Sequence, residues 1–207
     1  MSRPSAVFLF FRAFYRLAYT LLFRIRAWGV ENVPQEGGAL VVSNHQSFLD
    51  PPAVGLPLTR PVHFLARSSL FRWPGVGWLL RHKQAIPIER GTGDLAAIRT
   101  AVDLLRRGHA LVLFPEGTRS RDGSVGKFQP GFAMIAARAK VPIVPVAIDG
   151  SFEAWPRTRR VPRPHPVRVL YGEPMAPPEG RKAACLEAAD ETWRRVVALQ
   201  ARLRELA

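Results

Sequence analysis

Short apolar runs alternate with helical segments along most of this chain, and this alternation constrains the fold more than any other feature. The runs predicted to form strands are Gly38–Asn44, Val62–Ala66, Ala85–Ile88, Ala110–Phe114, Ile143–Ile148 and Val167–Tyr171. Helices are expected at Leu95–Arg107, Gly131–Lys140 and Arg181–Leu206. Strands that alternate with helices favour an α/β domain whose mixed sheet is mostly parallel and is flanked by helices.

The chain has 207 residues, the length of one domain. Its hydrophobic fraction of 47% excludes wholesale disorder. Cys185 is the single cysteine, which excludes a disulfide framework within the chain and a cysteine-based zinc cluster. We expect a segment over residues 1–28 that is distinct from one globular domain over residues 29–207.

The N-terminal segment Ala6–Trp28 is apolar and aromatic apart from four arginines and one threonine. Its uncharged runs, such as Leu17–Phe23, are far shorter than the roughly 20 residues of a bilayer span. On a helical wheel Arg12, Arg16 and Arg26 fall within about 80° of one another, opposite a broad apolar face. This pattern is typical of a helix that lies in a membrane interface. An ordinary amphipathic helix packed on its own domain is the alternative.

The formal net charge is +14, carried almost wholly by arginine. Nucleic acid, an anionic membrane, an acidic carrier protein and phosphorylated substrates are all partners that such a charge allows. Composition bias explains many of the arginines equally well. The stretch Trp155–Arg168 is predicted to be a basic loop, and a solvated connector, a membrane contact and a carrier contact all remain open for it.

A histidine and an aspartate stand five positions apart after the first predicted strand. Pro51 disfavours a helical conformation at Asp50, so a turn there would bring the Asp50 carboxylate onto the His45 imidazole. The carboxylate would hold a proton on one ring nitrogen and leave the other nitrogen as a general base. Alternatively, Asp50 caps a helix that starts at Pro51, and His45 is a polar loop residue.

The segment Phe114–Ser120 (FPEGTRS) follows another predicted strand. Gly117 allows close approach of the backbone, Thr118 offers a hydroxyl group, and Arg119 offers a guanidinium fork. This combination suits a phosphate or another oxyanion. A surface turn is the alternative.

Arg90 ends a further strand candidate and could supply a second guanidinium from a neighbouring strand. Ligands gather at the carboxyl ends of the strands in an open parallel sheet. His45, Arg90, Glu116 and Arg119 are all expected at that edge.

With these motifs taken together, the sequence resembles the lysophospholipid acyltransferase family, and within it the 1-acylglycerol-3-phosphate acyltransferases. The similarity covers about residues 30–172. The matching motifs are NHQSFLD (Asn44–Asp50), IPIER (Ile86–Arg90), FPEGTRS (Phe114–Ser120) and VPIVPVAI (Val141–Ile148), with KFQPGF (Lys127–Phe132) similar to a linked segment. Four motifs in order are far more specific than any one of them.

The resemblance implies transfer of a fatty acyl group from a thioester to the sn-2 hydroxyl of 1-acylglycerol-3-phosphate, which gives phosphatidic acid for phospholipid synthesis. His45 would be the general base, and Asp50 would orient it and stabilise its charge. No metal or cofactor is implied beyond the co-substrate, an acyl-CoA or acyl carrier protein thioester.

For the acceptor, the resemblance implies that Arg90 and Arg119 bind the phosphate. Gly117 and Thr118 would shape that pocket, and Glu116 would order the arginines or the acceptor glycerol. The implied partners are the lysophospholipid and an anionic membrane surface, without nucleic acid. The expected location is peripheral (monotopic), on the cytoplasmic face of the cell membrane.

Two alternatives stay open at this point. A different lyso-lipid acceptor, such as a lyso-ornithine lipid, is motivated by Gln129 and Pro130, which stand where many family members have lysines. A non-enzymatic basic binding protein would have no use for the pair of His45 and Asp50.

Overall fold

The computed structural model describes residue 17 and residues 19–72, 85–88, 95–179 and 181–206. Seven strands form one mixed sheet in the order β1-β7-β6-β2-β5-β3-β4. Their bounds are β1 Arg26–Trp28, β2 Ala39–Ser43, β3 Val62–Arg67, β4 Ala85–Ile88, β5 Ala110–Leu113, β6 Ile143–Asp149 and β7 Arg168–Tyr171. β6 and β7 pair antiparallel, and the other pairs are parallel. The expected α/β fold with a mostly parallel sheet is confirmed.

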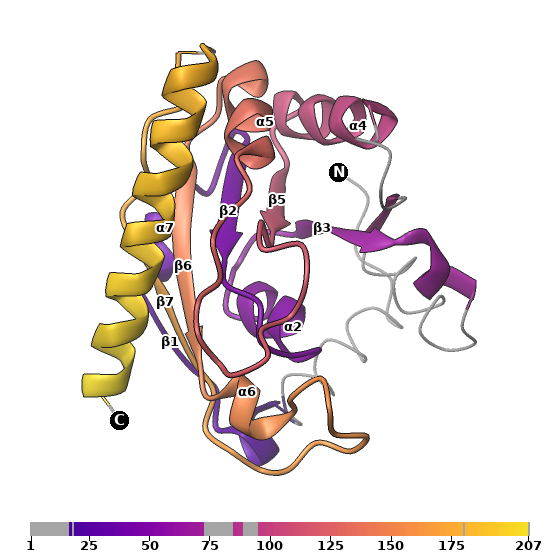
Figure 1. Ribbon diagram of the computed structural model, residues 1–207, viewed down its shortest axis with the longest axis vertical. Helices are drawn as coiled ribbons and strands as arrows, with labels where there is room; N and C mark the ends of the chain where they lie inside the picture. The colour runs from indigo at the N-terminus through magenta and orange to yellow at the C-terminus, as the bar shows by residue number, and fades with distance from the viewer. Residues whose placement is uncertain (1–16, 18, 73–84, 89–94, 180, 207) are drawn as a thin grey trace.

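Helices lie on both faces of this sheet. They are α2 Asp50–Gly55, α4 Leu95–Arg106, α5 Gly131–Ala139, α6 Ser151–Ala154 and α7 Lys182–Glu205, with 3-10 turns η1 Val30–Asn32 and η2 Ser68–Arg72. In Figure 1, α7 runs along β6, α4 and α5 lie at the upper end, and α6 lies at the lower end.

The central strand β2 shows how one sheet builds two cores. Its side chains alternate between the two faces, as the pleat requires. Leu40 and Val42 join the cluster formed with α4, α5 and the start of α7. Val41 joins the opposite cluster, which includes Val54 of α2 and Tyr19. All five β2 residues are buried, so the sequence shows a continuous apolar run rather than an alternating one.

The N-terminal helix expected over Ala6–Trp28 does not reach Trp28. Residues 19–23 are helical, whereas Arg26–Trp28 form the edge strand β1. The main chain leaves the helix at Arg24, whose φ is +41°. The N–H of Arg26 then donates to Val167 O at 3.1 Å, because the β7 edge offers hydrogen-bond partners that no helical pattern anticipates. Within the described ranges, every helix falls short of the length or the apolar character that crossing a bilayer requires.

The parallel pairing positions the functional residues. Because β2, β5 and β6 run in the same direction, their carboxyl ends meet at one edge of the sheet. The segments that begin with Asn44, Phe114 and Gly150 therefore leave the sheet side by side. This is the edge at which an open α/β sheet binds ligands.

Candidate active site

The imidazole of His45 contacts the carboxylate of Asp50. Nδ1 of His45 lies 2.8 Å from Oδ2 of Asp50, which is the contact expected from the sequence. With the proton on Nδ1, the ring donates to the carboxylate, and Nε2 is left with a free lone pair. The His45 side chain is 21% exposed and that of Asp50 is fully buried. The pair thus has the arrangement of a general base with the group that orients it.

The main chain of the same turn holds the Asp50 carboxylate in place. Oδ2 accepts the N–H of Gln46 at 2.5 Å and the N–H of Ser47 at 2.6 Å. The expected non-helical conformation of Asp50 is wrong, because α2 begins at Asp50 itself. Pro51 is tolerated there because the first turn of a helix needs no N–H donors from its residues. The contact with His45 forms because the turn precedes Asp50.

Hydrogen bonds to two neighbouring segments fix the start of the histidine-bearing loop. The Asn44 side chain donates to Ile148 O at 2.9 Å and accepts the N–H of Ile148 at 2.8 Å. On the other side, the N–H of Ser120 donates to His45 O at 2.7 Å. The loop therefore joins β6 to the segment that follows β5, and His45 lies between them.

Phe114 and Glu116, which follow β5 in the chain, both contact His45 directly. The Phe114 ring stacks on the imidazole, with centroids 4.4 Å apart and an interplanar angle of 24°. The carboxylate of Glu116 accepts the main-chain N–H of His45 at 2.9 Å. Burial raises the pKa of the Glu116 carboxyl to about 7, with hydrogen bonds from the N–H groups of His45 and Gly126 opposing the shift and the charge of Asp50 adding to it.

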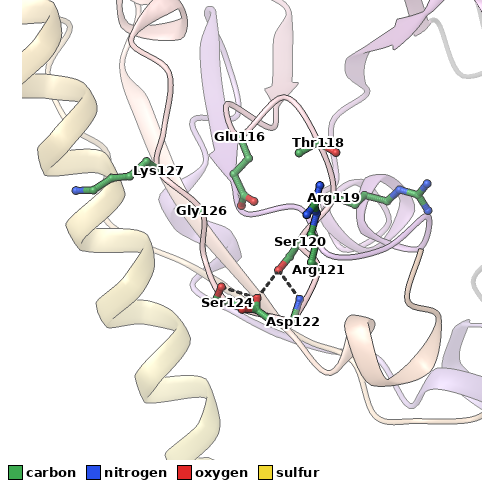
Figure 2. Close-up of a pocket in the computed structure, with 9 residues that line it drawn as sticks. All are labelled: Glu116, Thr118, Arg119, Ser120, Arg121, Asp122, Ser124, Gly126 and Lys127. Atoms are coloured by element: carbon green, nitrogen blue, oxygen red, sulfur yellow. Dashed lines mark hydrogen bonds between the residues drawn. The ribbon is translucent and has the colours of Figure 1, made fainter. Parts of the chain in front are cut away.

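A pocket of about 280 Å³ opens beside this pair. Figure 2 shows the residues that line it: Glu116, Thr118, Arg119, Ser120, Arg121, Asp122, Ser124, Gly126 and Lys127. Glu116 links the pocket to His45, which is not part of its lining. Gly117 does not line the pocket either, but its φ of +70° makes the turn that precedes Thr118. Arg119 and Arg121 suit an anionic ligand, and the carboxylates of Glu116 and Asp122 line the same pocket.

The guanidinium of Arg119 lies above the Phe48 ring, with its central carbon 3.6 Å from the ring centroid. Burial, and then the positive charge of Arg157, lower its pKa, whereas Asp50 raises it. Nη1 of Arg119 is buried and has no hydrogen-bond partner among the described residues. Arg90, the second expected phosphate ligand, lies outside the described residues.

Lys127 lines the pocket, but its ammonium group contacts side chains of α7. In Figure 2 the side chain points toward α7 and away from the other lining residues. Its Nζ lies 3.5 Å from the centroid of the Trp193 ring and 3.6 Å from a carboxylate oxygen of Asp190. Lys127 therefore directs its charge to α7 and not into the pocket.

The family model described as "Acyltransferase" matches residues 24–149 of the chain. This range includes His45, Asp50 and the whole segment Phe114–Ser120. The chain belongs to the acyltransferase family.

Several relatives of this acyltransferase are named 1-acyl-sn-glycerol-3-phosphate acyltransferase. The protein of that name from Pseudomonas aeruginosa is 30% identical over 88% of this chain and 77% of its own length. The chloroplastic protein from Arabidopsis thaliana is 33% identical over 79% of this chain and 46% of its own length. The chain spans about half the length of such plant and algal relatives.

The acyltransferase also resembles a solved structure. This is the crystal structure of the 1-acyl-sn-glycerophosphate (LPA) acyltransferase PlsC from Thermotoga maritima. The TM-score is 0.82 at 31% identity, over 96% of this chain and 80% of the other. Fold and sequence similarity therefore agree.

The acyltransferase contains a buried amide network that the sequence did not reveal. Nε2 of Gln46 donates to Gly123 O at 2.6 Å, and the Ser151 hydroxyl donates to Oε1 of Gln46 at 3.2 Å. Gln200 of α7 donates to the same Gly123 carbonyl at 3.3 Å. The network joins α7 to two loops: residues 44–49, which carry His45 (the histidine loop), and residues 116–127, which line the pocket (the pocket loop). Gln46 lies inside a quoted motif, but its partners are 77 and 105 residues away.

Proposed function

We propose that this acyltransferase transfers a fatty acyl group from a thioester to the sn-2 hydroxyl of 1-acylglycerol-3-phosphate. The contact between His45 and Asp50, beside a pocket lined by arginines, carries the proposal. The family match and the names of the relatives support the substrate class. The product is phosphatidic acid, a precursor of phospholipids.

In the proposed reaction, Nε2 of His45 removes the proton of the acceptor hydroxyl as its oxygen attacks the thioester carbonyl carbon. The carbon–sulfur bond breaks, and the leaving thiolate takes the proton back from His45. Asp50 orients the imidazole through Nδ1 and stabilises its positive charge without forming a covalent bond. General base catalysis of this kind contributes typically about 10²–10⁴-fold.

The acceptor phosphate is proposed to bind Arg119, with Arg90 as its second ligand. The unpartnered buried Nη1 of Arg119 supports this role, because such a donor lacks the hydrogen bond that an anion would supply. Thr118 and Gly117 shape the entrance. Glu116, with its raised pKa, is in reach of both His45 and the pocket and would order the acceptor glycerol.

The acyl donor is proposed to be acyl-CoA or acyl carrier protein, and the place of action the cytoplasmic face of the cell membrane. The helical residues 19–23 support a peripheral attachment. Tyr19 and Phe23 are buried in the domain, while Leu17, Leu21 and Leu22 are 57%, 68% and 48% exposed. Three exposed leucines beside two buried aromatic residues suit a segment that rests in a bilayer interface.

The proposal is tested with purified protein, lysophosphatidate and either acyl-CoA or acyl-acyl carrier protein. The wild-type protein should form phosphatidic acid, and His45→Ala should form it at least a hundredfold more slowly. A panel that adds lysophosphatidylcholine and lyso-ornithine lipid tests the acceptor. Turnover of lyso-ornithine lipid without turnover of lysophosphatidate would overturn the proposed acceptor. Turnover of neither, or an undiminished rate in His45→Ala, would overturn the proposed reaction.

A further inference from the structure

The loop between α6 and β7 carries charges that the proposed reaction does not use. Arg157, Arg159, Arg160 and Val161 are all exposed, and Val161 is 68% exposed. These four residues are referred to below as the basic turn. An apolar side chain that stands exposed among three guanidinium groups has no role in packing the domain.

Hydrogen bonds at its base give this loop a defined shape. The N–H of Arg163 donates to Ala154 O at 2.9 Å, and its Nε donates to Glu153 O at 2.7 Å. The indole N–H of Trp155 donates to Arg159 O at 3.0 Å. The loop is thus closed on α6, and its exposed side chains have a fixed base. Near its end the loop passes close to Gly150, since a Cβ on Gly150 would lie 2.0 Å from Pro166 O.

The arginines of the basic turn differ in their ion pairing from Arg168, further along the same segment. Arg168, at the start of β7, lies 3.9 Å from a carboxylate oxygen of Asp149. Among the described residues, Arg157, Arg159 and Arg160 form no ion pair. Three adjacent unpaired cations create a local positive potential that attracts an anionic surface.

Trp155, near the start of the loop that carries the basic turn, contacts the segment that follows His45. The Ser47 hydroxyl donates to Trp155 O at 2.8 Å, and the rings of Phe48 and Trp155 are 5.4 Å apart. Phe48 is 50% exposed. In Figure 1 this loop lies at the lower end of the molecule with α6, far from α4 and α5.

The helical segment that carries the exposed residues Leu17, Leu21 and Leu22 packs at the same end of the molecule as this loop. The Tyr19 hydroxyl donates to Leu49 O at 3.2 Å, and the N–H of Val167 donates to Phe23 O at 2.8 Å. Tyr19, Phe23, Leu49 and Val167 pack in one cluster with Trp155. Exposed arginines and exposed apolar side chains thus share one end of the molecule. This mixture suits a bilayer surface, where arginines meet anionic headgroups and apolar groups enter the interface.

We propose that the basic turn docks on anionic phospholipid headgroups and holds the edge that carries His45 against the bilayer. This inference deepens the proposed function, because a lipid acceptor would then reach the pocket from the membrane side. Each cation near an anionic surface contributes modestly, and three together strengthen binding about a hundredfold. The partner is a lipid surface, recognised by charge rather than by a single bound headgroup.

The test measures cosedimentation of the full chain with vesicles of phosphatidylcholine alone and of phosphatidylcholine with one part in three of phosphatidylglycerol. The variant Arg157→Gln/Arg159→Gln/Arg160→Gln should bind the anionic vesicles about a hundredfold more weakly at low salt. Its binding to the neutral vesicles should not change. Arg→Lys at the same three positions should retain most of the binding, because the charge is kept.

A matched control removes the same charge from the opposite end of the molecule. Arg99, Arg138 and Lys140 are exposed on or beside α4 and α5. Changing all three to Gln should leave vesicle binding within about twofold of wild type, because these residues would lie away from the bilayer. A thermal melt of every variant checks that the fold is intact.

Vesicle binding is scored without reference to turnover, so it separates this inference from the proposed reaction. Wild-type binding by the Gln variant, or equal losses in the Gln variant and the control, would overturn the docking surface. Unchanged vesicle binding with a lower rate only for acyl carrier protein donors would assign the turn to that acidic carrier and would also overturn it. Absence of acyl transfer in the wild type would overturn the reaction alone.

Discussion

The main-chain N–H of His45 donates to the carboxylate of Glu116 across 71 residues of sequence, at a distance of 2.9 Å. This hydrogen bond joins the histidine loop to the pocket loop. Glu116 has two protonation states near neutral pH, because burial raises the pKa of its carboxyl to about 7 although this hydrogen bond opposes the shift. The junction between the two loops therefore contains a group that titrates near neutral pH.

The stability of the domain should depend on pH through Glu116. Its pKa is about 7 in the folded protein and 4.5 ordinarily, so the folded state binds more protons between these values. The free energy of unfolding should therefore fall as pH rises through this window, by up to about 3 kcal/mol from this residue. Glu116→Gln keeps an oxygen for the His45 N–H and removes the titration.

Urea unfolding of the wild type and Glu116→Gln at pH 5, 6, 7 and 8 measures this effect. The variant should gain stability relative to the wild type as pH increases. Other titrating groups cancel in the difference between the two proteins. Two parallel stability curves would show that Glu116 does not titrate in this window.

The pair of His45 and Asp50 should act as a unit in catalysis. His45→Ala removes the base, and Asp50→Asn keeps the shape but removes the charge that orients and stabilises the imidazole. Both should lower kcat by about 10²–10⁴-fold with a smaller change in the acceptor KM. The double variant should be little worse than either single one, because both changes remove the same function.

Steady-state kinetics with lysophosphatidate measure this prediction, and circular dichroism checks the fold. Asp50→Asn also weakens the two hydrogen bonds from the main-chain N–H groups of Gln46 and Ser47, so its melting temperature should fall more than that of His45→Ala. Multiplicative losses in the double variant would instead indicate independent roles.

Arg119 should set the affinity for the acceptor phosphate. Arg119→Gln should raise the acceptor KM about 10- to 100-fold, because a charge-assisted hydrogen bond is worth roughly 1.5–3 kcal/mol. Lys127→Gln is the control, since Lys127 lines the same pocket but directs its ammonium group to α7. Equal effects of the two changes on KM would mean that only the overall charge matters.

Gln46 and Gln200 should contribute unequally to the stability of the domain, although both donate to Gly123 O. Gln46→Leu removes the acceptor of the buried Ser151 hydroxyl and should lower the free energy of unfolding by about 1–3 kcal/mol. Gln200→Leu should cost less, since Ile148 O keeps its bond from Asn44. Urea unfolding measures both. A larger loss in Gln200→Leu would contradict the order.

Most of the sheet was predictable because its strands are continuous apolar runs bounded by turns. Ala85–Ile88 has the predicted bounds, and the prediction for β6 ends one residue early. β1 was missed because three residues at an edge acquire their conformation from pairing with β7, which lies far along the chain. α6 is a helix of four residues, too short for a periodic pattern to indicate it.

The residues of the candidate site that lie within sequence motifs were predictable, whereas the contacts between distant segments were not. The contact between His45 and Asp50 joins residues five positions apart within one motif, although Asp50 is helical and not in the expected turn. Phe114 begins the FPEGTRS motif, but its stacking on His45 depends on the adjacency of β2 and β5. Arg157 had no signal beyond the charge of its loop. Contacts of this kind require the strand order, which the apolar runs alone do not give.

The bond between Asn44 and Ile148 spans 104 residues, and it sets an order of events for a chain made on the ribosome. His45 leaves the ribosome early, but β5 and β6, on either side of its strand, are synthesised much later. Contacts of such separation form only after the intervening chain is available to close the loop. His45, which is proposed to start the chemistry, is therefore synthesised early but is held in place only after most of the domain has been made. A nascent chain that stops short of residue 148 would carry the histidine without the scaffold that gives it a function.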